Sequence, residues 1–558
     1  MVAGRQRRLR HAAVRFAAML PGPAVGFARS VGQRAAVESV PTVVPTALGV
    51  PRDHLAVGAS HIGGRLKPGR LFTYAHDGIG NRDWTFAGSA AGMTEYGTND
   101  KNQLSSVTNP GVAHVSGYAA ATSRVEVGYA GSTRAAHRDG AYWYAAVPVA
   151  NANSAVVAVI TVTITNPDGA YTVRTITRLV HKASESLGGG LGVDLRGSRT
   201  SDSVWDYEWD DFDRLQSVTI KTALRASYNV RVEFAYDFFG RRIGKTVKEW
   251  DSQAGQWVTA EEGVTKFIWS GWLLLAETNE ENKITRSYVW GRDLSGSVGG
   301  AGGIGGLLAV QHHNTTTGVV EHTYWVGADE RGDTQRLVEA DGSQPKVVAA
   351  FEYGPHGEVL AVDAAPGVNL DISNPTSLCP FLHSTKYFDA ETGLYYFGYR
   401  YMDPATGTWI SRDPIGEQGG LNLYAYCMND PVGTTDPYGL SLIIPPFDSG
   451  QIGWVYKGTG VDPAGLPQSY VGSTIDLPGR GLETTRHAYH SVFSDPNTTI
   501  EAWRVYGEPN AELTPQHTPR AALNRALRAA EQPVIDFARA EMAARGREFR
   551  GHDTYLGE

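Results

Sequence analysis

The sequence has little cysteine, no long apolar run and no excess of positive charge. Cys379 and Cys427 are the two cysteines in 558 residues. They are too few for a disulfide framework, and we interpret both as small buried hydrophobic residues. No uninterrupted apolar stretch reaches the roughly 18 residues that a membrane-spanning helix needs, so no membrane span is expected. The balance of 50 Lys and Arg against 58 Asp and Glu excludes a chain that is basic overall and coats nucleic acid.

Glycine and aromatic residues are abundant instead, with 65 Gly, 26 Tyr and 13 Trp. Aromatic residues favour strands and Gly favours tight turns, so this composition predicts many short hairpins. The length predicts several domains or one large repeat architecture. Residues 1–51 differ, because their basic start is followed by an apolar stretch that Arg15 and two prolines interrupt. We expect this segment to be poorly ordered and to contain no convincing signal peptide.

Residues 52–384 repeat one pattern, in which an aromatic-rich strand is followed by an acidic or Gly-containing turn, an Arg and another strand. YEWDDFDRL from Tyr207 and AYDFFGRRIGK from Ala235 are two copies. Each copy is typical of a β-hairpin, and hairpins in series can share one long winding sheet. Residues 115–180 alternate apolar and polar residues and predict a β-sandwich-like module. The Gly-rich run from Ser297 lacks the ending of a phosphate loop, so we interpret it as a turn between strands.

Residues 385–440 are dense in aromatics, Gly and Asp-Pro steps and finish in DPYGL, after which the composition changes. Together with the repeats, this stretch closely resembles the Rhs family, in which YD repeats are closed by an Rhs-repeat-associated core. The resemblance implies a mainly β fold wound into a hollow, cocoon-like shell. It also implies a variable C-terminal toxin, here residues 441–558, that the shell encloses.

Within residues 385–440, the resemblance implies an aspartyl autoprotease built from Arg400, Asp413 and Asp436 that cuts between Leu440 and Ser441. Two neighbouring carboxyl groups do not both ionise easily, so one can polarise the peptide carbonyl while the other activates water. Because such a pair titrates as a unit, the two roles stay open. Arg400 either orients a carboxylate or stabilises the oxyanion. Taken alone, an Asp-Pro step is typical of a capped turn. The four such steps begin at Asp403, Asp413, Asp430 and Asp436.

Residues 441–558 predict a hairpin followed by helices, and so a small α+β domain. In WVYKGTGVDPAGLPQSYVGSTI, a turn centred on Pro463 places Tyr456 opposite Tyr470. A short helix over LETTRHAYH would carry Arg486 and His490 on one face, because they are four residues apart.

A carboxylate and two tyrosine motifs in this domain point to one family. In LRAAEQPVIDF, Glu531 lies among apolar residues, and a divalent metal is one candidate partner for it. With the VY and YVGST motifs, these residues resemble the GIY-YIG nucleases. The resemblance implies hydrolysis of a phosphodiester in which Tyr456, helped by Tyr470 and His490, either activates or positions the attacking water. Arg486 would stabilise charge on the phosphate and Glu531 would hold one Mg²⁺.

Two features of this domain stay open. Arg480 competes with Arg486 for the role of catalytic arginine, and we prefer Arg486 because Gly479 and Gly481 disfavour a helix around Arg480. Residues 441–558 are not basic overall, so any contact with nucleic acid must be local. The candidate contacts to the phosphate backbone are Lys457, Arg525 and Arg528.

The expected function is that of a polymorphic toxin whose shell encloses a nuclease and releases it by self-cleavage into a target cell. Expected partners are nucleic acid, with DNA favoured over RNA, a cognate immunity protein, and a secretion or shell-plugging partner. One alternative is a cell-surface or secreted YD-repeat protein whose shell is structural and whose tail is inert. Another keeps the carrier but makes the tail a nucleic-acid binder without cleavage.

Overall fold

The computed structural model describes most of the chain up to residue 440 and three strands beyond it. Within the described residues no helix has the length and apolar character to cross a membrane. The predicted poorly ordered segment, 1–51, lies outside the described residues. Those residues are 55–62, 65–87, 92–187, 192–339, 345–364, 374–440 and the strands within 451–461, 467–474 and 499–506.

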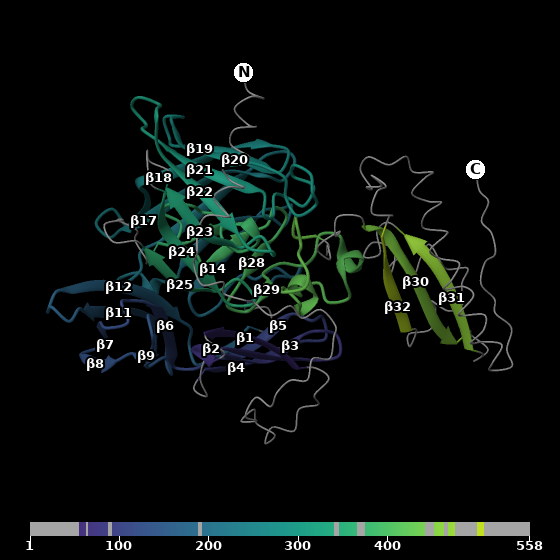
Figure 1. Cartoon of the computed structure of the whole chain (residues 1–558), viewed down its shortest axis with the longest axis horizontal. Coiled ribbons are helices and arrows are strands. Elements are labelled where there is room, and N and C mark those ends of the chain that lie inside the picture. Colours follow the sequence, from purple (N-terminus) through teal and green to yellow (C-terminus); the bar gives the residue numbers. More distant parts are fainter. Residues whose placement is uncertain are drawn as a thin grey trace.

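The predicted mainly β fold is confirmed for the described residues, whose regular elements are strands and short 3-10 turns. The expected single winding sheet is wrong in part, because the strands between residues 55 and 364 form four sheets. The largest has twelve antiparallel strands in chain order (Figure 1). Its strands are β14 (Trp205–Trp209), β15 (Leu215–Ile220), β16 (Arg231–Tyr236), β17 (Arg242–Asp251), β18 (Gln256–Ser270), β19 (Leu273–Thr278), β20 (Ile284–Trp290), β21 (Leu307–His313), β22 (Val320–Ala328), β23 (Thr334–Glu339), β24 (Lys346–Tyr353) and β25 (Val359–Ala364).

The first repeats form a separate six-stranded sheet in the order β1-β2-β3-β4-β5-β13. Strands β6 to β12, which form a module of two other sheets, lie between β5 and β13 in the sequence. After this module the chain returns to the first sheet, where β13 pairs with β5. The module therefore divides the repeats into two sheets. The strands are β1 (Leu55–Ile62), β2 (Arg65–His76), β3 (Arg82–Ala87), β4 (Met93–Thr98), β5 (Leu104–Thr108) and β13 (Ser184–Ser186).

The intervening module consists of a three-stranded sheet, β6-β10-β9, and a four-stranded sheet, β12-β11-β7-β8. One apolar cluster joins them, with Val115 and Trp143 from the first sheet and Val127 and Ile160 from the second. Two sheets that share one core form a sandwich-like arrangement. The strands are β6 (Val112–Tyr118), β7 (Arg124–Tyr129), β8 (Ser132–Ala135), β9 (His137–Asp139), β10 (Tyr142–Pro148), β11 (Val156–Thr165) and β12 (Tyr171–Val180).

The repeat turns share one hydrogen-bonded arrangement. At the turn between β16 and β17, one carboxylate oxygen of Asp237 accepts the N–H groups of Phe239 and Arg241, both at 2.9 Å. Arg241 Nε donates to the other oxygen at 2.7 Å, so the acid and the Arg of the repeat hold the reversal together. The same pair of backbone contacts, two and four residues on, recurs at Asp77, Asn99, Asp194, Asp210 and Asp329.

The aromatic residue that precedes a repeat turn links its repeat to the one before. Tyr236 Oη donates to the carbonyl of Leu215 at 2.7 Å. Trp269 Nε1 donates to the carbonyl of Arg242 at 2.7 Å. These polar groups lie on otherwise apolar rings, so each ring can pack in the interior while its donor is satisfied. The aromatic-acid pattern of the sequence is therefore a repeat-to-repeat connection as well as a turn.

Residues 374–440 pack against the twelve-stranded sheet. Their aromatic side chains share the main apolar cluster with that sheet. The buried Arg242 of β17 forms an ion pair with Asp389, Nη1 to Oδ2 at 2.5 Å, among aromatic rings that include Tyr387 and Tyr396. Where residues 374–440 pack on the twelve-stranded sheet, they cover its face. The hollow interior of the shell stays a prediction. The segment contains β26 (Tyr387–Asp389), β27 (Leu394–Tyr396), β28 (Tyr401–Asp403) and β29 (Thr408–Trp409), with 3-10 turns at η4 (His383–Thr385), η5 (Gly416–Gly419) and η6 (Tyr426–Asn429), while η3 (Thr222–Leu224) lies between β15 and β16.

Three strands beyond residue 440 form a separate sheet in the order β31-β30-β32, which lies beside the larger sheets in Figure 1. The hairpin of β30 and β31 is present, but Tyr456 pairs with Gly472 and Tyr470 with Gly458. The predicted direct pairing of the two tyrosines is therefore wrong. The strand pairing ends with Val461 opposite Pro467, so its centre falls one residue beyond Pro463 and every pair is shifted by two positions. The strands are β30 (Gln451–Val461), β31 (Pro467–Thr474) and β32 (Thr499–Tyr506).

Candidate functional site

The structure brings together the three side chains predicted for self-cleavage. Arg400 lies just before β28, Asp413 follows β29, and Asp436 lies in the last described turn. Arg400 Nη2 is 2.8 Å from Asp413 Oδ2 and 3.4 Å from Asp436 Oδ2. Each of the three residues is 4% exposed. One buried guanidinium thus lies between two buried carboxyl groups from distant parts of the segment.

Arg400 also holds the backbone that leads to the predicted cut. Its Nε donates to the carbonyl of Gly439 at 2.5 Å, and its Nη1 donates to the carbonyl of Leu423 at 3.1 Å. The guanidinium carbon lies 4.2 Å from the centre of the Trp409 ring. A planar group with five donors can make these contacts at once, which the single ammonium of Lys cannot. Arg400 therefore fixes the residue that precedes Leu440.

Asp436 caps the turn that contains Leu440. Its Oδ1 accepts the N–H groups of Tyr438 at 3.3 Å, Gly439 at 2.8 Å and Leu440 at 3.1 Å. The other carboxylate oxygen faces Arg400. Asp436 consequently links Arg400 to the backbone of the residue whose carbonyl belongs to the predicted scissile bond.

Asp413 approaches the Leu440 carbonyl across a glycine. A Cβ atom at Gly419 would lie 2.3 Å from Asp413 Oδ2 and 2.7 Å from the Leu440 carbonyl oxygen. The absence of a side chain at Gly419 therefore permits the carboxyl and the carbonyl to come near the same point. Gly419 was not among the predicted site residues, and the only sign of it in the sequence is the pair of glycines that follows DPIGEQ.

Burial determines the protonation of this cluster. Burial raises the pKa of Asp413 to about 6, although Arg400 lowers it, and the charge of Asp436 adds to the increase. Burial also raises the pKa of Asp436, against the effect of Arg400 and the three backbone N–H groups. For Arg400, burial lowers the pKa while both carboxylates oppose the change. The raised pKa values favour a shared proton on the carboxyl pair at mildly acidic pH, as acid-base chemistry by two carboxyl groups requires.

The remaining Asp-Pro steps serve other contacts. Asp403 Oδ2 accepts a hydrogen bond from Arg199 Nη1 at 2.8 Å, and although burial opposes it, Arg199 holds the pKa of Asp403 below its usual value. Asp430 Oδ1 accepts the N–H of Gly433 at 2.9 Å and caps a turn. The four similar steps thus separate into two that meet at Arg400 and two that do not.

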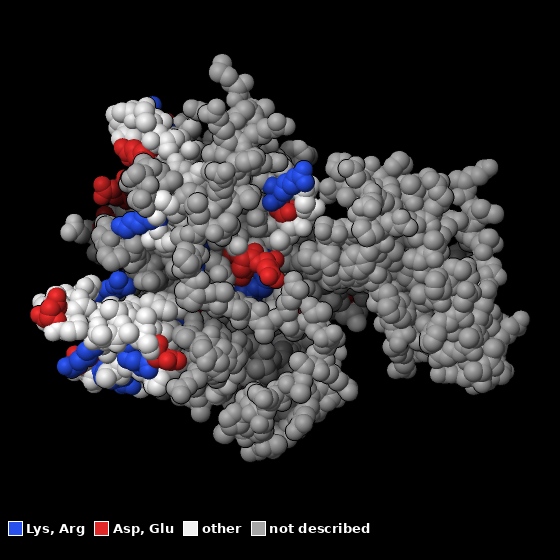
Figure 2. All heavy atoms as spheres, in the orientation of Figure 1, with Lys and Arg blue, Asp and Glu red and all other residues white. Residues whose placement is uncertain are grey.

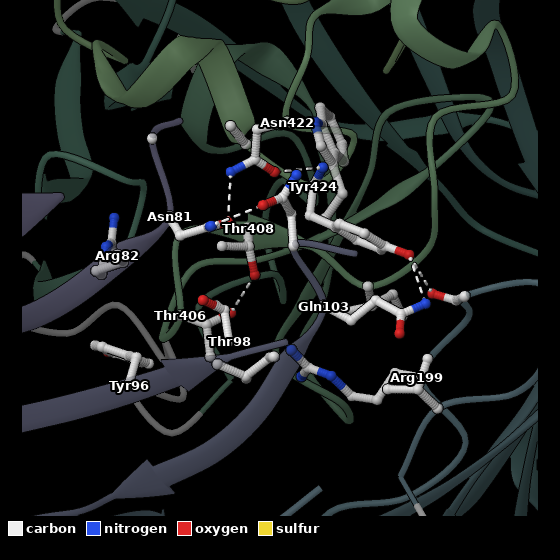
Figure 3. Close-up of a pocket in the computed structure, with 18 residues that line it drawn as sticks. Asn81, Arg82, Tyr96, Thr98, Gln103, Arg199, Thr406, Thr408, Asn422 and Tyr424 are labelled. Atoms are coloured by element: carbon white, nitrogen blue, oxygen red, sulfur yellow. Dashed lines mark hydrogen bonds between the residues drawn. The ribbon is translucent and has the colours of Figure 1, made fainter. Parts of the chain in front are cut away.

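A pocket lies where the six-stranded sheet meets the 374–440 segment (Figure 3). Asn422 Nδ2 donates to Asn81 Oδ1 at 2.9 Å, and Tyr424 Oη donates to the carbonyl of Gly197 at 3.1 Å. Neither Asp413 nor Asp436 lines it. Its contacts join the segment to the N-terminal repeats, and Arg400 and its two acids lie elsewhere in the segment.

The residues predicted for the nuclease are for the most part not described. Tyr456 and Lys457 lie on β30 and Tyr470 lies on β31. Outside the described residues lie Ser441, Arg480, Arg486, His490, Arg525, Arg528 and Glu531. Within the described part of the chain, no group of three or more His, Cys, Asp or Glu side chains could hold a metal ion. Basic and acidic side chains are mixed over the described surface in Figure 2, without one large field of positive charge.

Comparisons with known proteins relate the chain to much longer toxins. No family model matches it. It is 27% identical over 285 residues to the tRNA3(Ser)-specific nuclease WapA of Bacillus spizizenii, a match that covers 50% of this chain and 10% of that protein. It is 30% identical over 259 residues to the double-stranded DNA deaminase toxin A of Burkholderia cenocepacia, covering 45% of this chain and 16% of that protein. Among solved structures, the chain matches the crystal structure of TcdB2-TccC3-Cdc42 with a TM-score of 0.35 and 18% identity. The match covers 69% of this chain and 18% of the chain in that structure.

The chain therefore spans less than a fifth of the length of these two relatives. Both are named for a reaction on nucleic acid, but the reactions differ, one being a tRNA nuclease and the other a DNA deaminase. The chain is thus similar to nuclease and deaminase toxins, and the similarity alone does not specify one chemistry.

Proposed function

We propose that this chain is a toxin carrier that cleaves itself after Leu440 and releases residues 441–558 as a nuclease. The observation that supports self-cleavage best is the placement of two buried carboxyl groups on one arginine beside the backbone of Leu440. A buried ion pair by itself adds little to stability, because desolvation offsets the attraction. A catalytic role therefore explains two buried acids beside one arginine and a peptide backbone better than a stabilising role does.

In the proposed reaction, water attacks the carbonyl carbon of Leu440. Asp413, which approaches Gly419 as the Leu440 carbonyl oxygen does, carries the proton that polarises the carbonyl. Asp436, the other member of the pair, takes the proton that the water loses. The carbon–nitrogen bond then breaks, Ser441 leaves as a free amine after accepting a proton, and Leu440 becomes a carboxylic acid. Arg400 keeps Gly439 and both acids in register while charge moves between them.

Self-cleavage is tested on the whole chain by gel electrophoresis and intact mass. The unmutated protein should yield a fragment that begins at Ser441, whereas Asp413→Asn and Asp436→Asn should each give one uncut band. Asp430→Asn is the matched control, because Asp430 is an Asp-Pro residue of the same segment that caps a turn. An unmutated chain that stays intact, or a cut Asp436→Asn chain, overturns the proposal.

For the released part we propose Mg²⁺-dependent hydrolysis of phosphodiester bonds. The support is the set of GIY-YIG-like motifs and a β30–β31 hairpin that includes Tyr456 and Tyr470. Glu531 would hold the metal, and Arg486 with His490 would act at the phosphate. Delivery into a target cell, protection of the producer by an immunity protein, and enclosure by the shell belong to the same proposal.

The nuclease is tested with the self-cleaved full-length protein. Plasmid DNA and a tRNA mixture are incubated with Mg²⁺ or with EDTA, beside a Glu531→Ala protein that still cleaves itself. We expect the unmutated protein to degrade a substrate with Mg²⁺ but not with EDTA. Glu531→Ala should not degrade it under either condition. If neither substrate is cut, the catalytic reading fails. Retention of nucleic acid without cutting would then favour a binding tail, and no retention would favour an inert one.

A further inference from the structure

The glycine-rich loop between β20 and β21 contacts the segment that is cut. A Cβ atom at Gly302 would lie 2.5 Å from the Pro437 carbonyl oxygen and 3.0 Å from Lys386 Nζ. Gly302 also has a φ of +60°, which disfavours any other residue there. Tyr438 Oη donates to the carbonyl of Gly299 at 3.0 Å. The loop is therefore more than a connection between strands, because its backbone lies against Pro437 and Tyr438.

Lys386 bridges the loop and Pro437 by hydrogen bonds. Its Nζ donates to the carbonyl of Gly302 at 2.9 Å and to the carbonyl of Pro437 at 2.6 Å. The residue is 6% exposed, and its ammonium also lies 5.7 Å from the centre of the Phe397 ring. Burying a lysine is costly unless its donors are used, and two of its three donors here join the loop to the residue after Asp436.

The loop is itself held in a fixed shape. One carboxylate oxygen of Asp293 accepts the N–H groups of Ala301 at 2.7 Å and Gly303 at 3.1 Å. Thr385 Oγ1 accepts the N–H of Gly305 at 2.8 Å. The carbonyls of Gly299 and Gly302 thus belong to a loop that Asp293 and Thr385 hold in place. Lys386 follows Thr385 directly in the sequence.

We propose that Lys386 is a positioning residue for self-cleavage. In this proposal Lys386 holds the Pro437 carbonyl against the loop of residues 297–306. With Pro437 held, Asp436 can direct Oδ1 to the backbone of Leu440 and Oδ2 to Arg400. Lys386 touches neither the water nor the scissile bond, so it acts through Asp436. The inference rests on the proposed self-cleavage and adds a residue and a loop to it.

Charge gives this residue a signature that a packing role would lack. The charged groups that face its ammonium are Asp436 and Asp293, which favour the charged form, but burial outweighs them and lowers the pKa of Lys386 to about 8. Above that pH the lysine becomes neutral and binds the Pro437 carbonyl more weakly. An arginine at position 386 would stay charged throughout.

The experiment follows self-cleavage of the full chain during cell-free synthesis, as the rate at which the Ser441 fragment appears. Lys386→Met should slow this rate at least tenfold at pH 7, while Lys386→Arg should restore part of it. In the unmutated chain, the loss of rate with increasing pH should steepen above about pH 8, and in Lys386→Arg that steepening should disappear. Tyr438→Phe, which removes the bond to Gly299 and keeps the ring, should slow cleavage by a smaller factor.

The outcomes separate this inference from the proposed function. If the unmutated chain does not cleave, self-cleavage itself fails. If it cleaves and Asp436→Asn does not, but Lys386→Met matches the unmutated rate, only the role of Lys386 is overturned. Identical pH profiles for the unmutated chain and Lys386→Arg would likewise overturn it. Should Lys386→Met be misfolded, as judged by its near-ultraviolet circular dichroism, Lys386→Arg and Tyr438→Phe still decide the question.

Discussion

The repeat turns and the final Asp-Pro turn use the same local device with opposite electrostatic results. In both, one oxygen of an aspartate accepts backbone N–H groups that follow it, and the other oxygen faces an arginine. At Asp237, burial raises the pKa, but Arg241 and the backbone donors together outweigh it and the pKa falls below its usual value. At Asp436, burial prevails and the pKa rises. Burial therefore distinguishes a carboxylate that holds a turn from one that can take part in proton transfer.

The largest difference is expected when each arginine is removed. Arg400→Ala leaves two buried carboxyl groups without their cation and should abolish cleavage and cost about 3–5 kcal/mol of unfolding free energy. Arg241→Ala removes a partly exposed partner and should cost about 1 kcal/mol or less. Urea denaturation followed by Trp fluorescence measures both, with Arg241→Ala built into the uncut Asp413→Asn chain and that chain as the reference. Equal costs for the two arginines would contradict the comparison.

Filling the space at Gly419 should separate geometry from charge. Gly419→Ala would place a methyl group against Asp413 Oδ2 and the Leu440 carbonyl, and a displacement of about 1 Å can cost about 100-fold in rate. We therefore expect cleavage to slow by about 100-fold while the fold is retained. Gly78→Ala is the control, since a Cβ atom there would meet no atom within 4 Å. Unchanged cleavage in Gly419→Ala would show that Asp413 does not act at Leu440.

The rate of self-cleavage should depend on pH through the raised pKa of Asp413. If the protonated carboxyl polarises the Leu440 carbonyl, the rate is highest where Asp413 is protonated and falls as pH rises through about 6. Well above that pH the fall should approach about tenfold per unit. Timed gels across a pH series measure it. A rate that instead rises between pH 5 and pH 7 would mean that the ionised form is needed and would reverse the assignment.

The smallest effect is expected at the repeat turn. The lowered pKa of Asp237 means that its carboxylate contributes stability above its unfolded pKa, and that this stability is lost as pH falls through the lower folded pKa. Asp237→Asn should therefore cost about 1 kcal/mol or less at pH 7 and progressively less below pH ~4. Urea midpoints at pH 7 and at about pH 3, below the unfolded pKa, test this. A large cost at pH 7, or loss of cleavage, would place the repeat turns in the same class as the Asp436 turn.

Several features were predictable from sequence because their causes are local. The hairpins follow from aromatic strands and Asp or Gly turns. Arg400, Asp413 and Asp436 were instead indicated by the family resemblance of residues 385–440. Gly419 and Lys386 were not predictable in this way, since each matters through atoms brought near it by the fold. The division of the repeats into two sheets was missed for a similar reason, because β13 pairs with β5 across an intervening module.

The candidate aspartates for cleavage came from the resemblance of residues 385–440 to the Rhs family. The sequence by itself determined that the chain is built of β-hairpins and that an Asp-Pro-rich segment follows the repeats. These are short-range properties of residue type and spacing. Only the tertiary structure showed which Asp-Pro steps meet at Arg400, because Asp403 and Asp430 also precede a proline in the same segment and yet make other contacts. It also decided the protonation of Asp413 and Asp436. The cost of ionising a carboxyl group depends on how much water the whole fold removes from it, and no short stretch of sequence contains that information.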